Sequence, residues 1–293
     1  FVTTGYLVRL MAHHPDSFKN HTHLIIDEVH ERSVDGDLIC YFARDLLLKY
    51  SHLKVILMSA TADTDLYQSY FTNYGISKGQ DFGELNCLTV GARRFPVSIS
   101  YLDDIIKDNK ISPDGKNAAR GLMNLCSRNS DISSELVKQQ YFVALSLIQC
   151  LGVPGTGILV FVSGIADIVE MLERLDGADK FIPIGLHGDL PDDEQIAAFA
   201  PVPSDKVKVI IATNIAESSL TIPDVDMVLC MGSHKSMQYH LKTHRANLMM
   251  HWISQASAVQ RAGRTGRVRP GKVYRLYSQS TYHKFKSHDE CEV

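Results

Sequence analysis

The sequence GILVFVS, at Gly157–Ser163, is a short apolar run rich in β-branched residues that ends at a polar residue. Five further runs of the same kind recur along the chain: HLIID at His23–Asp27, KVILMSA at Lys54–Ala60, VKVIIAT at Val207–Thr213, VDMVLCMG at Val225–Gly232 and KVYRLYS at Lys272–Ser278. Runs of this length with polar ends are typical of buried β-strands. We therefore predict six buried strands.

Helical patterns separate these runs. One stripe of apolar residues at helical spacing precedes the second run, and another follows Gly157–Ser163; they comprise Leu38, Ile39, Phe42, Ala43, Leu46 and Leu47, and Ile165, Ile168, Val169, Leu172 and Leu175. Apolar residues spaced in this way form one buried face of a helix. Alternating strands and helices predict an α/β fold with a mainly parallel sheet.

Composition limits the classes of function. The 293 residues contain 30 Lys and Arg against 33 Asp and Glu, a net charge of −3, which excludes an extensive basic coat for nucleic acid. At about 100–200 residues per domain, the length predicts two domains. We place their boundary near Val97 and expect a loop or insertion in the polar stretch Asp103–Ser134.

The cysteines and the lengths of the apolar runs bear on the cellular compartment in which the protein is expected. The six cysteines include no CxxC pair, which favours a reducing environment. No apolar run approaches the roughly 18 residues that span a bilayer, and the start of the chain lacks the layout of a signal peptide. We expect an intracellular protein without a membrane partner, and we interpret the chain, which does not begin with Met, as part of a longer one.

Polar clusters follow four of the predicted strands. They are Asp27-Glu28-Val29-His30, Ser59-Ala60-Thr61, Ser163-Gly164, and Thr213-Asn214 with Glu217-Ser218-Ser219. In open α/β sheets, ligands bind beyond the carboxyl ends of the strands. This pattern predicts an active-site cleft there.

The first cluster carries two adjacent carboxylates. Asp27 and Glu28 stand where one carboxylate can hold the Mg²⁺ of a nucleotide and its neighbour can take a proton from water. An acidic turn without a ligand is the alternative interpretation of these residues alone. A zinc-protease motif is excluded, because the helical partner of His30, position 34, is Val34.

The segment Gln260–Arg267, QRAGRTGR, contains three arginines at a spacing of three. If the segment is helical, the arginines share a face, while Gly263 and Gly266 allow another backbone or a phosphate chain to approach the opposite surface. Guanidinium groups so arranged suit the charge on a transferring γ-phosphoryl group. The alternative, a solvated basic face, gains nothing from two helical glycines, which cost about 1 kcal/mol each.

Seven short segments along the chain can be compared, in their order, with the motifs of known families. They are TTGYLVR at Thr3–Arg9, DEVHERS at Asp27–Ser33, SAT at Ser59–Thr61, VFVSG at Val160–Gly164, LHGDLP at Leu186–Pro191, ATNIAESSLTI at Ala212–Ile222 and QRAGRTGR at Gln260–Arg267. They resemble motifs Ib to VI of superfamily 2 helicases. The chain is similar to the DEAH/RHA group of ATP-dependent RNA helicases, with Val29 giving a DEVH variant. The resemblance implies tandem RecA-like domains of the P-loop NTPase type, with mainly parallel sheets.

The resemblance also implies roles for individual residues. In the first domain, Asp27 would coordinate Mg²⁺ through water, and Glu28 would be the base for the hydrolytic water. His30 would couple the nucleotide to the second domain. Ser59 and Thr61 would link hydrolysis to domain movement. In the second, the implied γ-phosphate sensor and arginine fingers are Gln260, Arg264 and Arg267, Ser218 and Thr221 lie near the ATP, and Phe199 stacks on adenine. A core role is the alternative for Phe199.

The implied partner is single-stranded RNA, bound without regard to sequence. RNA would contact one side through Thr3, Gly5 and Arg9 and the other through Ser163, Gly164, His187, Thr213 and Asn214. Hydroxyls, amides and backbone N–H groups that bind phosphate and sugar do not distinguish bases. The family also has a strand-separating β-hairpin corresponding to His234–His251, for which a surface loop is the alternative.

The sequence departs from the family pattern in two places. No GxxxxGK[ST] phosphate loop occurs, and Pro223 stands where many relatives carry an acidic residue, with Asp224 adjacent. We therefore expect residues 1–97 to form the C-terminal half of the ATP-binding domain. Residues 98–281 would form the second RecA-like domain, with the insertion near 103–134, and residues 282–293 the start of a linker.

The prediction is an ATP-dependent RNA helicase with 3′-to-5′ polarity, in the nucleus or cytoplasm, whose chain as given is inactive alone. An activator protein is a further partner that the resemblance allows. Two alternatives stay open. One is a non-catalytic RNA-binding scaffold built on a helicase core, and the other is a DNA or DNA:RNA helicase of the same superfamily.

Overall fold

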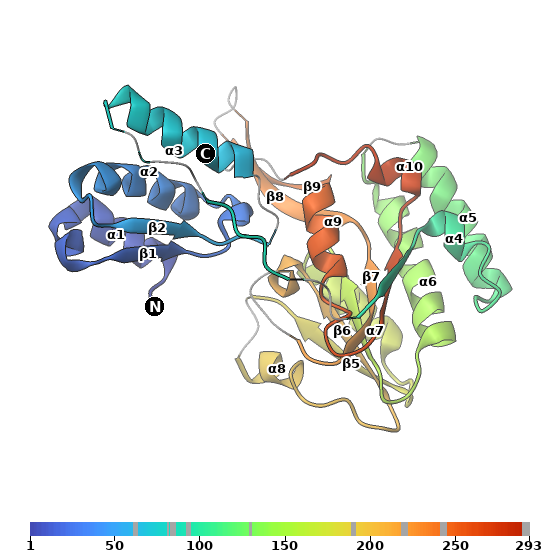
Figure 1. The fold of residues 1–293 in the computed structure, drawn as a ribbon. Helices are drawn as coiled ribbons and strands as arrows, with labels where there is room; N and C mark the ends of the chain where they lie inside the picture. Colours follow the sequence, from blue (N-terminus) through green and yellow to red (C-terminus); the bar gives the residue numbers. More distant parts are fainter. Residues whose placement is uncertain are drawn as a thin grey trace. The chain divides into compact units, whose positions relative to one another are not determined.

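The computed structural model describes residues 1–60, 64–80, 82, 86–91, 95–128, 131–188, 192–217, 222–240 and 245–288. The chain divides into two compact units (Figure 1). The first comprises Phe1–Gly91, and the second comprises Ala92–His288. Each unit has its own buried core, so each is described separately.

The first unit packs helices against a pair of parallel strands. Its elements are α1 (Thr4–His13), a 3₁₀ turn (Pro15–Asn20), β1 (His23–Ile26), a second 3₁₀ turn (Val29–Glu31), α2 (Val34–Lys49), β2 (Lys54–Leu57) and α3 (Thr64–Ser77). The strands pair in register, with Leu24 opposite Val55. The core combines Leu24 and Ile26 with Ile39 of α2 and Phe71 of α3. The two predicted strands of this unit are confirmed.

The second unit contains a six-stranded parallel sheet. Its strands are β3 (Val97–Ser100), β4 (Gly157–Phe161), β5 (Phe181–Leu186), β6 (Val207–Ala212), β7 (Val225–Cys230) and β10 (Gly271–Arg275). They lie in the order β3-β10-β7-β4-β6-β5, and each neighbouring pair is parallel. The predicted α/β class with a mainly parallel sheet is confirmed. Two strands that the sequence did not indicate, β3 and β5, form the sheet's edges.

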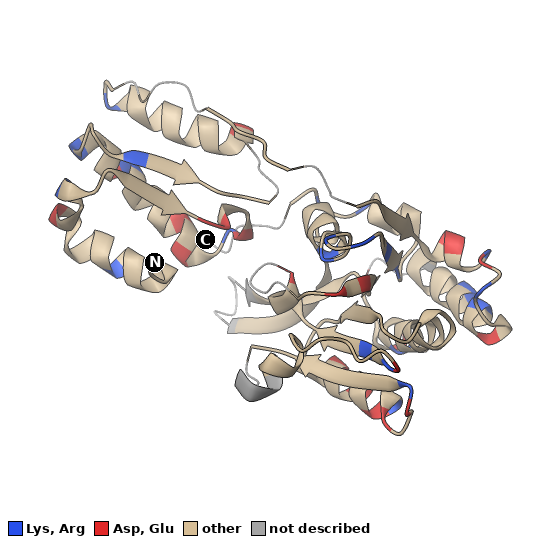
Figure 2. Ribbon diagram, turned by 60° about the horizontal axis from the view of Figure 1, so that its bottom comes forward, with Lys and Arg blue, Asp and Glu red and all other residues tan. Residues whose placement is uncertain are grey.

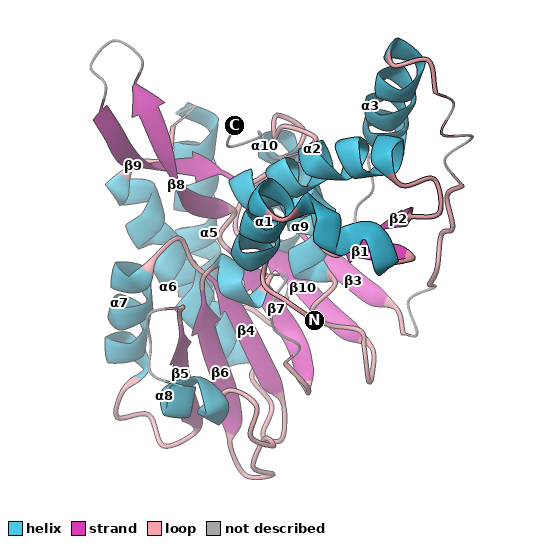
Figure 3. Cartoon of the chain, turned by 90° about the vertical axis from the view of Figure 1, so that its left-hand side faces the viewer, coloured by secondary structure: helices cyan, strands magenta, loops and turns pink. Residues whose placement is uncertain are grey.

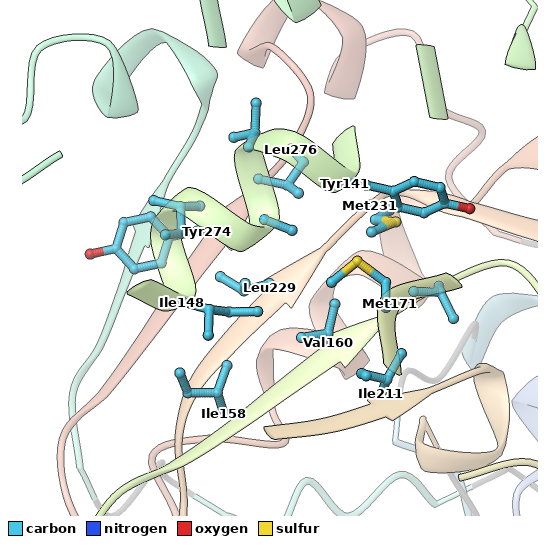
Figure 4. Close-up of a cluster of buried hydrophobic side chains, with 14 of the residues drawn as sticks. Tyr141, Ile148, Ile158, Val160, Met171, Ile211, Leu229, Met231, Tyr274 and Leu276 are labelled. Atoms are coloured by element: carbon cyan, nitrogen blue, oxygen red, sulfur yellow. The ribbon is translucent and has the colours of Figure 1, made fainter. Parts of the chain in front are cut away.

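Helices cover both faces of this sheet. On one face lie α4 (Leu102–Ile105), α5 (Pro113–Arg128), α6 (Ser134–Leu151) and α7 (Ile165–Leu175). Figure 4 shows Tyr141 and Ile148 of α6 and Met171 of α7 meeting strand residues such as Val160 and Leu229. The opposite face is covered by the turn after α8 (Asp192–Ala197), a 3₁₀ turn (Asn214–Ala216) and α9 (Gln255–Ala262). The remaining helix is α10 (Gln279–Tyr282).

Most of the polar stretch after β3 is helical. The sequence indicated a loop or insertion over residues 103–134, but most of α4 and all of α5 lie there. The loop interpretation is wrong because α5 needs only one apolar face. Ala119 and Leu122 are fully buried and Cys126 nearly so, while the remaining positions carry the Gly, Ser and Asn residues.

A β-hairpin follows the end of β7. Strands β8 (Ser233–His240) and β9 (Arg245–Trp252) pair antiparallel, with Met237 opposite Leu248 (Figure 3). The hairpin predicted at His234–His251 is confirmed, and the surface-loop alternative is wrong. Because β8 begins three residues after β7 ends, the hairpin starts at the carboxyl end of the parallel sheet.

Charges of both signs are interspersed over both units, in keeping with the net charge of −3 (Figure 2). Among the described residues, no helix combines the length and hydrophobicity needed to cross a bilayer.

Candidate functional site

In the first unit, an acidic turn directly follows β1. Glu28 adopts a left-handed backbone conformation, with φ of 55°, which is uncommon outside glycine. Its amide donates to Asp27 Oδ1 over 2.9 Å, and the next amide, of Val29, donates to the Met58 carbonyl over 3.1 Å. The Tyr67 hydroxyl donates to the Val29 carbonyl over 2.6 Å. Bonds on both sides therefore hold the turn, and the exposed Asp27 carboxylate lies at the strand end.

His30 connects this turn to the end of the neighbouring strand. The Ala60 amide donates to His30 Nδ1 over 3.3 Å, and Glu28 Oε2 lies 3.4 Å from the same nitrogen. Within the described part of the chain, neither His30 Nε2 nor the buried Ser59 hydroxyl has a partner. The structure thus brings together Asp27, Glu28, His30 and Ser59, while Thr61 lies outside the described residues.

The RNA-binding candidates of this unit lie on one helix. Thr3 is the N-cap of α1, and its hydroxyl accepts from the Tyr6 amide over 3.4 Å. Gly5 follows in the first turn, and the exposed Arg9 lies one turn further on the same face. The Thr3 hydroxyl therefore also begins a helix, which is a role that the motif alone did not indicate.

In the second unit, three neighbouring strands bring their polar ends together. Phe161 of β4 and Leu186 of β5 both pair with Ala212 of β6, so the residues that follow them line one edge of the sheet. The candidates Ser163, Gly164, His187, Thr213 and Asn214 all follow these strands. Asn214 is exposed, His187 is half-buried, and Thr213 is buried.

Ser163 is held by a buried carboxylate. Its amide donates to Asp167 Oδ2 over 3.0 Å, its hydroxyl donates to the same oxygen, and the Tyr141 hydroxyl donates to Asp167 Oδ1 over 2.5 Å. Burial and the Asp167 carboxylate both raise the pKa of Tyr141. This network fixes the backbone after β4. The Lys235 side chain from β8 lies directly over Gly164, where a Cβ would stand 3.0 Å from the lysine Nζ.

The arginine segment is only partly helical. Helix α9 ends at Ala262, and Gly263 is its C-cap. Arg264 and Arg267 therefore follow in a loop, and the predicted single helical face of three arginines is wrong. Gly266 turns this loop with φ of 77°, a conformation that ends a helix. Arg267 Nε donates to the Gly263 carbonyl over 3.3 Å.

Arg261 takes a different direction from the other arginines. Its side chain is 1% exposed, and its Nε donates to Glu217 Oε2 over 2.9 Å. The guanidinium also donates to the Ser233 carbonyl over 3.3 Å and lies 4.9 Å from the ring centre of Phe161. Burial lowers the pKa of Arg261, but the Glu217 carboxylate and the Cys230 thiol together raise it by more, so the net direction is upward. Both residues stand within quoted motifs, yet nothing in the sequence indicated that they pair.

The remaining ATP candidates lie around the opposite face of the sheet. Phe199, in the turn after α8, is half-buried against the cluster that contains Leu159 and Ile210. Gln260 lies on α9, and its buried side-chain Nε2 has no partner within the described residues. Ser218 and Thr221 lie outside the described residues. Asp224, beside Pro223, has a φ of 61°.

Comparison with known proteins identifies the family. The model of the helicase conserved C-terminal domain matches residues 141–269. The Arabidopsis thaliana DExH-box ATP-dependent RNA helicase DExH1 is 32% identical over 100% of this chain, and human ATP-dependent RNA helicase DHX30 is 33% identical over 97%. Two structures of the Escherichia coli DExH-box NTPase and DEAH/RHA helicase HrpB cover 98% and 99% of this chain with a TM-score of 0.68, at 25% and 26% identity. The chain belongs to the DEAH/RHA group of superfamily 2 helicases.

This helicase chain spans only part of its relatives' length. It covers 32% of DExH1, 22% of human DHX30, and 31% and 32% of the two HrpB chains. Within the described residues, no group of three or more His, Cys, Asp and Glu side chains could hold a metal ion.

Proposed function

We propose that the chain is part of an ATP-dependent RNA helicase that couples ATP hydrolysis to 3′-to-5′ movement along RNA and to unwinding or remodelling of RNA. The observation that carries this proposal is the fixed acidic turn. Asp27 and Glu28 stand beyond β1, Glu28 in a strained backbone conformation that neighbouring hydrogen bonds maintain, and His30 joins this turn to the end of β2. Strained backbone held in this way is characteristic of functional sites.

The residues of this turn fit a magnesium nucleotide. One Asp27 oxygen accepts the Glu28 amide, which leaves the other for a water molecule on Mg²⁺. Mg²⁺, when bound, neutralises charge on the phosphates. Glu28 accepts the proton of the attacking water. His30 is hydrogen-bonded to the Ala60 amide, so that a movement of this turn is transmitted to the Ser59-Ala60 segment. We assign the same coupling role to Ser59 and Thr61.

In the second unit we assign the nucleotide contacts to α9 and the loop that follows it, to the segment after β6 and to the turn after α8. Arg264 and Arg267 stabilise charge on the γ-phosphoryl group, and Gln260 senses it through an amide that is buried without a partner in the described part. We assign Ser218 and Thr221 to ATP binding as well, and Phe199 stacks on adenine. The half-buried ring of Phe199 supports that assignment.

We assign RNA binding to the polar strand ends and to α1. The first unit contributes Thr3, Gly5 and Arg9, and the second contributes Ser163, Gly164, His187, Thr213 and Asn214. Hydroxyl, amide and backbone contacts to phosphate and sugar make binding independent of sequence. The protein would meet RNA in the nucleus or cytoplasm, with an activator protein as a further partner.

The ATPase activity of two proteins tests this function. We expect this chain alone to hydrolyse ATP poorly, and a version extended upstream through a GxxxxGK[ST] loop to show RNA-stimulated turnover. In the extended version, Glu28→Gln should retain nucleotide binding and lose turnover by at least about a hundredfold, because the base is absent. Robust turnover by the short chain, or an unchanged kcat in the Glu28→Gln variant, would contradict the proposal.

Two alternatives give different results in the same assay. A scaffold would show no RNA-stimulated turnover in either version, although Asp27, Glu28, Gln260, Arg264 and Arg267 are all present. A DNA or DNA:RNA helicase would respond to DNA at least as strongly as to RNA.

A further inference from the structure

Lys208, on β6, is a buried lysine whose ammonium group binds the backbone of another segment. The residue is 2% exposed. Its Nζ donates to the carbonyl of Ala198 over 3.1 Å and to that of Ala200 over 2.7 Å. Burying an ammonium group is costly unless it is hydrogen-bonded. Burial lowers the pKa of Lys208, and the Asp224 carboxylate opposes this shift.

These two carbonyls belong to the residues on either side of Phe199. Beyond α8 the chain continues in tight turns, in which the Phe199 amide donates to the Ile196 carbonyl over 3.0 Å and the Ala200 amide donates to the Ala197 carbonyl over 3.3 Å. The amides of the turn are therefore bonded within the turn. The carbonyls of Ala198 and Ala200 are bonded by Lys208, so one side chain holds the backbone of the residues on either side of Phe199.

The ring of Phe199 is half-buried, and its inner side packs on the cluster that contains Leu159, Ala198 and Ile210. A ring in this position can stack on a planar group only if its orientation is held. An apolar residue at position 208 would fill similar space but would leave the carbonyls of Ala198 and Ala200 without a donor.

We propose that Lys208 is a positioning residue for the purine ring of the nucleotide, because it holds the turn that orients Phe199. The inference rests on the proposed function, in which Phe199 stacks on adenine. A lysine that only stabilised the fold would affect every nucleotide alike. A lysine that acts through Phe199 affects only substrates that carry a base.

The test compares a substrate with a base and one without. In the extended protein described above, Lys208→Met should raise the KM for ATP about three- to tenfold, with kcat unchanged, because stacking weakens while the phosphate contacts stay. Hydrolysis of ribose 5′-triphosphate, which lacks a base, should keep its kcat/KM. Lys272→Met, which removes an exposed lysine from β10, is the matched control and should change neither substrate.

A double variant separates this inference from the proposed function. In the Phe199→Ala background, Lys208→Met should raise the KM for ATP no further. If Phe199→Ala raises this KM and Lys208→Met does not, the role of Lys208 is refuted and that of Phe199 survives. If Phe199→Ala has no effect, the assigned adenine contact is wrong, and the inference falls with it. Equal losses with both substrates also overturn the inference.

Hydrogen exchange tests the positioning step on the 293-residue chain, without ATP hydrolysis. Lys208→Met should speed exchange of the amides of residues 198–200 and leave the rest of the second unit unchanged. Unchanged exchange there overturns the inference. If the methionine variant does not fold, Lys208→Gln replaces it, since an amide still donates to one carbonyl, and an intermediate increase in KM is then expected.

Discussion

A buried ion pair connects two of the sequence motifs inside the second unit. Arg261 is 1% exposed and is bonded to Glu217, whose side chain is 11% exposed. Removing one partner of such a pair leaves an uncompensated charge in the interior. We expect Glu217→Gln to lower the free energy of unfolding of the second unit by about 3–5 kcal/mol. Urea denaturation followed by tryptophan fluorescence measures this change.

An exposed ion pair is the control for that experiment. Arg174 and Glu170 lie one turn apart on α7 and are both substantially exposed. Arg174→Gln should therefore cost less than about 1 kcal/mol. The double variant Glu217→Gln with Arg261→Met removes both buried charges and should recover part of the stability. Equal losses from Glu217→Gln and Arg174→Gln would show that the buried pair has no special importance.

At the scale of elements, the loop after α9 packs against the start of β3. Gly266 combines a φ of 77° with close contact, because a Cβ there would lie 2.4 Å from Val97 Cγ2 and 3.3 Å from the Phe95 carbonyl oxygen. Gly266→Ala should destabilise the second unit by about 2–4 kcal/mol, since backbone strain and a clash combine.

A substitution at Gly177 provides a control that separates the backbone strain from the steric clash. It has nearly the same φ, 76°, but a Cβ there would meet nothing within 4 Å. Gly177→Ala should therefore cost only the backbone term, about 1 kcal/mol. Thermal unfolding of both variants measures the difference. If the two substitutions have equal effects, the contact with Val97 does not contribute.

The sequence predicted central elements better than peripheral ones. Strands β4, β6 and β7 have neighbours on both sides and are apolar except at Lys208 and Asp226, close to what the pattern required. The edge strand β5 escaped detection because Pro183 and Gly185 interrupt it, and an edge strand tolerates proline, which lacks one donor.

The candidate site, like the fold, could be predicted only in part from the sequence. Motif order located the polar residues at the strand ends, since parallel strands place them together. It could not show where α9 ends, because three arginines at helical spacing favour a longer helix, whereas α9 ends at Ala262 with Gly263 as its C-cap. Nor could it show which arginine is buried, since that depends on the partner, Glu217, more than 40 residues away.

At the scale of the whole molecule, the two units differ in the size of their sheets. The described part of the first unit has a two-stranded sheet, on which Ile25 is 56% exposed and Ile56 41% exposed. The second has six strands covered on both faces. Small sheets with little cover are marginally stable in water. The first unit should therefore unfold at lower denaturant concentration than the second.

The sequence contains a single tryptophan, Trp252, which lies on β9 of the second unit. Its fluorescence therefore reports the second unit alone, whereas far-ultraviolet circular dichroism reports both. In urea, we expect the circular dichroism signal to begin falling while the fluorescence is unchanged. Leu46→Ala, a cavity in the first unit's core costing about 2–5 kcal/mol, should move only the early phase. Coincident transitions in both signals would instead mean that the two units unfold as one cooperative structure.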